Sequence, residues 1–220
     1  MNSYKSVENG GEVVSNFEKN TEIKCGNIQN KLRALEVFDP EIRDRILERF
    51  PKTTLQIINK AKSNQWVPVH YSIELSECVA ASMTEDHESV REEKIFNWSL
   101  KASTYSIESS LVAPFMRVAL NLLMIKSSTV LKMCPQLWET IHRNCGKLTA
   151  FEKSPSYLEI RLKDLPTVMV KSRPYLIGVT AFIKSMLNFS KAKGNVVLEK
   201  ISEDTHTAIL LVTWDPDITS

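Results

Sequence analysis

Apolar residues recur with two different periods between residues 172 and 214, and this stretch predicts a helix followed by two strands. Its first half carries apolar residues at i, i+3, i+7, i+10 and i+11, which is one side of a helix: Leu176, Val179, Ile183, Met186 and Leu187. Pro174 suits the first helical turn, and Gly194 suits the C-terminal cap. The short β-branched segments 196–201 and 207–214 predict an antiparallel hairpin.

Two more strands are predicted just before this unit, at 147–153 and 156–163. The second alternates strictly, with Leu158, Ile160 and Leu162 on one face, so one face is expected to be buried and the other solvated. A hairpin and one helix are too small to fold alone. We therefore expect both strand pairs to share one antiparallel sheet of about four strands, with helix 174–191 between the pairs and packed across it.

Helical spacing dominates the chain before residue 143. We expect helices near 28–38, 41–50, 53–63, 71–83, 109–125 and 128–142, a charged loop at 84–94 that runs into a solvated helical face, and an edge strand at 23–26. Asp39 and Pro40 suit an N-cap and a first helical residue, and Pro135 should kink or split its helix. This order predicts an α+β fold, with N-terminal helices packed on a C-terminal sheet.

The composition is that of an ordinary globular protein, with 43% apolar and 25% charged residues among 220. Residues 1–20 are polar and predict a mobile tail, which leaves 21–220 as a single α+β domain. A net charge of +2 does not favour nucleic acid. There is no apolar run of about 18 residues and no apolar signal core, so we expect no membrane span and a cytoplasmic location with reduced thiols.

Motifs for catalysis or metal binding are missing from the sequence. The four cysteines are widely spaced, and neither a nucleophile elbow nor a phosphate-binding glycine loop occurs. Cys145 follows a helix end, where the dipole raises a thiol pKa, so an inert cysteine is expected. Residues 171–173 place two cations at a helix start; a bound anion is one interpretation, and Ser172 as an ordinary cap is the one we favour.

Four short motifs in the second half carry a family resemblance. They are Pro135-Gln-Leu-Trp138 in a helix, Gly146 entering a strand, Pro174-Tyr-Leu-Ile-Gly178 opening a helix, and Val212-Thr-Trp214 ending a strand. Over residues 30–215 the chain resembles the superfamily of haem-nitric-oxide-binding domains, vinyl-reductase-type ligand-binding domains and transport-particle subunits, and within it a family abundant in myxobacteria. The resemblance implies a pocket between helices and sheet, often a dimer, and a role in sensing or binding.

In the nitric-oxide-binding branch, the resemblance implies a helical histidine on the iron and a Tyr-x-Ser-x-Arg motif on the propionates. The corresponding candidates here are His142, Tyr157 and Arg161. Glu159 stands where serine is expected and would repel a propionate, and His142 comes only shortly before Tyr157. We therefore expect no cofactor, and we interpret Tyr157, Glu159 and Arg161 as the solvated face of a strand.

We predict a non-enzymatic sensor or interaction domain that binds a small apolar ligand or a protein partner. The alternative is an enzyme or gas sensor that uses a bound cofactor such as haem. The expected pocket residues are Phe115, Leu122, Trp138, Leu176 and Ile183. Helix 109–125 is apolar around most of its circumference, so it is core, pocket wall or the face of a homodimer, with 86–100 as the other candidate face.

Overall fold

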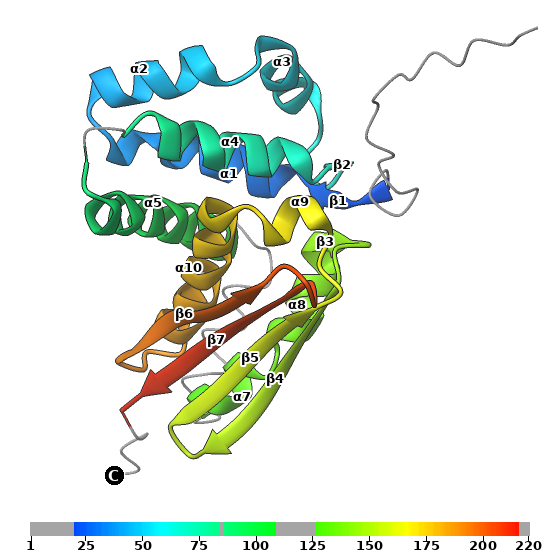
Figure 1. Cartoon of the computed structure of the whole chain (residues 1–220), viewed down its shortest axis with the longest axis vertical. Helices are drawn as coiled ribbons and strands as arrows, with labels where there is room; N and C mark the ends of the chain where they lie inside the picture. Colours follow the sequence, from blue (N-terminus) through cyan, green and yellow to red (C-terminus); the bar gives the residue numbers. More distant parts are fainter. Residues whose placement is uncertain (1–19, 84–85, 109–125, 216–220) are drawn as a thin grey trace, which may run out of the picture.

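The protein has an α+β fold, with N-terminal helices and a C-terminal antiparallel sheet (Figure 1). The computed structural model describes residues 20–83, 86–108 and 126–215. The helix predicted at 109–125 and the tail predicted at 1–20, apart from Asn20, lie outside these ranges. No helix within the described ranges is both long and apolar enough to cross a membrane.

The N-terminal helices follow the predicted pattern closely. They are α1 (Cys25–Arg33), the 3-10 turn η2 (Ala34–Val37), α2 (Pro40–Arg49), α3 (Lys52–Lys60), α4 (His70–Ala81) and α5 (Glu88–Glu108). The Asp39 side chain accepts a hydrogen bond from the Ile42 N–H at 2.9 Å, and Pro40 begins α2, as predicted. The charged stretch from Glu88 is not a loop, because it already forms the first turns of α5.

A small three-stranded sheet joins the helical half to the chain that follows it. Strand β1 (Glu22–Lys24) lies between β2 (Trp66–Pro68) and β3 (His142–Arg143), and both pairings are antiparallel. The segment at 23–26 was predicted as an edge strand, and this prediction is wrong. Its two neighbours come from distant parts of the chain, which local patterns do not report.

The four-stranded sheet is the one that the alternation predicted. Its order is β4 (Lys147–Ser154), β5 (Tyr157–Lys163), β7 (Thr207–Trp214) and β6 (Gly194–Ser202), all antiparallel. Leu158, Ile160 and Leu162 are fully buried, which confirms the predicted register.

The long helix α10 (Arg173–Phe189) connects the two strand pairs, after the short α9 (Thr167–Val170). It packs against α5 and α4 on one side and against β6 on another, so it is the central element of the molecule (Figure 1). The predicted helix at 128–142 is split near Pro135 into α7 (Ser127–Leu131) and α8 (Cys134–Ile141).

Gly194 does not cap α10. The left-handed residue after this helix is Lys191, with φ of 65°, and Gly194 instead begins β6 opposite Trp214. A Cβ atom at Gly194 would lie 2.1 Å from the Thr213 carbonyl oxygen. The glycine is therefore needed for the close approach of two strands, and not for a helix end.

Candidate functional site

Lys31 lies on the buried face of α1 with only 7% of its surface exposed. Its Nζ donates hydrogen bonds to the hydroxyls of Ser72 and Ser76 on α4, at 2.9 and 3.2 Å. The ion pairs found among the described residues include none to Lys31. Because burial disfavours the charged form, the pKa of the Lys31 ammonium falls to about 7.

Aromatic rings surround the Lys31 amine in place of a carboxylate. Nζ lies 5.0 Å from the centroid of the Tyr175 ring and 5.6 Å from that of the Trp98 ring. The Trp98 indole N–H also donates to the Lys31 carbonyl oxygen at 2.9 Å, which holds α5 against α1. Ring faces attract an ammonium more weakly than a carboxylate does, so they leave its charge incompletely compensated.

His142 continues this polar interior into the C-terminal half. Its Nε2 lies 2.8 Å from the Tyr175 hydroxyl, and its ring stacks on Trp138 with centroids 3.8 Å apart. Burial, reinforced by the charge of Lys31, lowers the pKa of His142 to about 3. Burial likewise raises the pKa of Tyr175 well above its usual value. Both groups are therefore neutral near pH 7.

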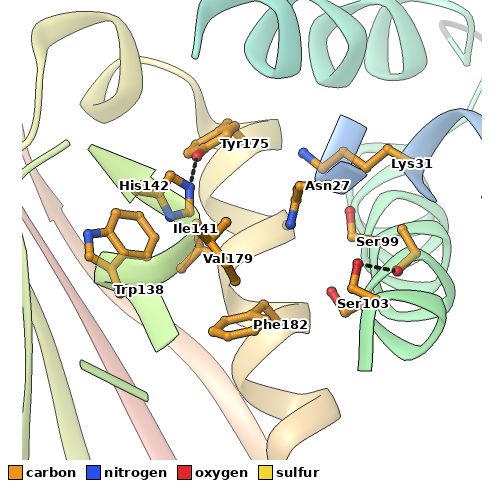
Figure 2. A pocket seen from close by; sticks show the side chains of 13 residues that line it. Asn27, Lys31, Ser99, Ser103, Trp138, Ile141, His142, Tyr175, Val179 and Phe182 are labelled. Carbon is orange, nitrogen blue, oxygen red and sulfur yellow. Dashed lines mark hydrogen bonds between the residues drawn. The ribbon is translucent and has the colours of Figure 1, made fainter. Parts of the chain in front are cut away.

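These side chains border a small cavity between α1, α5, α8 and α10 (Figure 2). Its volume of about 30 Å³ accommodates roughly two water molecules. The Ser99 hydroxyl lies at its wall, buried and without a hydrogen-bond partner among the described residues. The lining mixes apolar residues such as Val179 and Phe182 with polar ones such as Asn27 and Ser103.

The predicted pocket residues divide into three groups. Trp138 lines this cavity, and so does His142, which was a candidate for cofactor binding and not for the pocket. Leu176 and Ile183 are buried on other faces of α10, whereas Tyr175, Gly178, Val179 and Phe182 are the residues of α10 at the cavity. Phe115 and Leu122 lie outside the described residues. The lining also differs from the apolar one expected, because hydroxyl, amide and amine groups converge there.

The remaining candidates have structural roles in the described parts of the chain. Burial raises the pKa of Cys145 to about 12, and its Sγ contacts the carbonyl oxygens of Glu22 and Arg143 at 3.5 and 3.2 Å. Ser172 is the N-cap of α10 and accepts from the Tyr175 N–H at 3.3 Å. The neighbouring Arg173 pairs with Glu92, so a protein carboxylate already satisfies this cation.

Lys31 is the functional candidate that sequence reasoning missed. It comes three residues after Ile28 and four before Leu35, so it occupies the apolar side of its helix. A lysine in such a position indicates a buried charge, because the apolar side of the helix packs against the core. The pattern alone does not tell which helices meet it there.

Comparisons with known proteins identify the fold. No protein-family model matches the sequence, and no curated protein sequence matches it either. The structure is similar to the Fe(II) unliganded H-NOX protein from K. algicida, with 12% identity, a TM-score of 0.60, and coverage of 90% of this chain and 100% of that one. It is also similar to an oxygen-binding H-NOX domain related to soluble guanylate cyclases, with 11% identity, a TM-score of 0.56, and coverage of 90% and 98%. The chain therefore has an H-NOX-like fold.

The described residues do not fit a haem group. The cavity of about 30 Å³ is an order of magnitude smaller than a typical pocket of several hundred Å³. The Nε2 atom of His142 is engaged by Tyr175 and the ring face by Trp138, while Nδ1 is buried without a hydrogen-bond partner among the described residues. Tyr157 and Arg161 alternate with the fully buried residues of β5, and Arg161 pairs with Glu159 on the opposite face of the sheet from the core.

Proposed function

We propose that this chain is a non-enzymatic sensor domain that binds a small ligand in the cavity between α1, α5, α8 and α10. The polar cavity carries the proposal, because a buried hydroxyl without a partner costs free energy that a ligand can recover. The H-NOX-like fold supports it, since one of the similar structures is an oxygen-binding H-NOX domain. A protein partner that receives the signal is part of this proposal.

The position of the cavity suits a sensor. Its wall combines α1 and α5 from the N-terminal half with α8 and α10 from the C-terminal half (Figure 2). A ligand held there contacts both halves at once, so it favours the arrangement in which both contacts are made. Of Cys145, His142 and Arg161, the groups that an enzyme would use, His142 is the one among the described residues that line this cavity.

A solution NMR titration of the full chain with a mixed panel of small neutral and charged compounds tests ligand binding. Shifts at the methyl groups of Ile141 and Val179, which line the cavity, would support the proposal. Val37, with 46% of its surface exposed on η2, is the control methyl group and should not shift. A panel that leaves the cavity methyl groups unchanged would contradict the proposed function.

The haem alternative has its own test. Protein expressed with added haem precursor should show no Soret band, because the cavity beside His142 is too small for haem and Tyr157 and Arg161 lie on the face of β5 opposite the core. Native mass spectrometry of the same sample measures retained ligand and subunit count. A strong Soret band that His142→Ala abolishes would defeat this prediction and favour a gas sensor.

A further inference from the structure

The cavity holds an ammonium group with no counter-charge. Lys31 is the only lysine or arginine among its lining residues, and none of those described residues is aspartate or glutamate. Two N–H groups of the ammonium reach the neutral hydroxyls of Ser72 and Ser76. The third has no hydrogen-bond acceptor among the described residues, so the site has unused donor capacity as well as unbalanced charge.

Gly178 on α10 lies beside this charge in the cavity wall and has no side chain of its own there. A Cβ atom at that position would lie 3.3 Å from the Ser99 Oγ and 3.7 Å from the Lys31 Nζ. One point in space therefore borders both a buried hydroxyl without a partner and a buried amine. Figure 2 shows Asn27 and Ser99 reaching into the same region from α1 and α5.

We propose that the part of the cavity beside Gly178 binds a small monovalent anion of the size of chloride or formate, held by the Lys31 ammonium and the Ser99 hydroxyl. This inference rests on the proposed function, since it names the ligand class of the same cavity. The volume of about 30 Å³ suits an ion that replaces one or two waters. Charge-assisted hydrogen bonds to the anion supply the counter-charge that the protein lacks.

Anion binding is coupled to proton uptake, because only charged Lys31 attracts the ion. The groups that face Nζ are Ser72 and Ser76 from α4, Trp98 from α5 and Tyr175 from α10, and the charge of Lys31 also acts on His142 of β3. Two of these titrate, and both stay neutral between pH 6 and 9: the pKa of His142 is about 3 and that of Tyr175 is raised. The pH dependence therefore belongs to Lys31.

The test is a titration of full-length protein, labelled with ¹³C at the lysine ε-carbon, with sodium formate or sodium chloride. Sodium sulfate holds the ionic strength constant. We expect a saturable shift of one buried lysine signal. Anion binding should also raise the pKa of that lysine. Because the free-protein pKa is about 7, the apparent affinity should fall about 100-fold between pH 6 and pH 9.

Three variants assign the effect. Lys31→Met removes the cation and should abolish the saturable binding, which is then followed through the Val179 methyl signal. Gly178→Ala keeps the lysine but adds a methyl group beside Lys31 and Ser99, where the anion would lie. It should weaken anion binding by roughly tenfold or more. Lys101→Met removes an exposed lysine of α5 and should bind as the wild type does.

Two results would overturn the inference: an unsaturable shift that is equal in all variants, which is ionic screening only, or an affinity that does not change with pH. If neutral compounds shift the Val179 methyl signal while both anions fail to saturate, the sensor proposal stands and the anion class falls. If no compound of any class shifts it, the proposed function fails as well.

Discussion

Lys31 keeps its charge up to about pH 10.5 in the unfolded chain, but burial lowers its pKa to about 7 in the folded protein. Between these values the unfolded state binds more protons, so the free energy of unfolding rises with pH. Below pH 7 both states are charged, and the folded protein bears the full cost of the buried ammonium. The stability contribution of this one residue is therefore least favourable in acid.

Lys31→Met tests that dependence at the residue level. Methionine fills most of the same space without a charge, so the variant should gain most over the wild type at pH 6. Its advantage should shrink by roughly 4 kcal/mol on going to pH 10, because the wild-type lysine then folds neutral. Urea unfolding at pH 6, 8 and 10 measures the difference, with Lys101→Met as the control. A difference that does not vary with pH would show that the Lys31 ammonium is hydrated in the folded state.

At the level of elements, α10 is buried on nearly all sides, and this determines which of its residues meet the cavity. Eleven of its residues are buried, including both Leu176 and Tyr175, although they lie about 100° apart around the helix. The stripe of Leu176 and Ile183 shows that the helix has an apolar side. It does not show that the side with Tyr175 and Gly178 forms the cavity wall.

The hairpin of β6 and β7 depends on close backbone contact at Gly194. Gly194→Ala places a methyl group 2.1 Å from the Thr213 carbonyl oxygen, so the strands must separate. We expect a loss of about 3 kcal/mol in the free energy of unfolding. Chemical denaturation measures it, and Val197→Ala, on the same strand with an exposed side chain, should cost under about 1 kcal/mol. Equal losses in the two variants would show that the strands yield easily at this point.

At the level of the whole molecule, association into a homodimer remains a prediction from the sequence. Residues 109–125 are apolar around most of the predicted helix, and a symmetric pair would bury the same patch twice. The wild type should then sediment as a dimer at tens of micromolar, as expected for an interface of roughly 1,200–2,000 Å². Leu123→Glu should give folded monomers. A wild type that sediments as a monomer would end the dimer prediction.

Much of the fold is encoded locally and could be predicted. The alternation at Leu158, Ile160 and Leu162 indicated a strand with one buried face, and the Asp39 cap and Pro135 placed helix boundaries that the structure has. These features depend on neighbours a few residues away, since strand and helix periods are properties of the local backbone. The α+β class followed from the order of such elements.

Only the tertiary structure determined which segments pack against the buried face of each helix and strand. The central position of β1, the contact of the Cys145 Sγ with the Glu22 carbonyl oxygen and the hydrogen bond between His142 and Tyr175 all join segments far apart in the chain. Lys31 gives the clearest case, because its environment comes from α4, α5 and α10 at once. A periodic pattern reports that a side chain is turned inward. Its partners, and with them its pKa and the cavity beside it, depend on long-range packing that no local pattern contains.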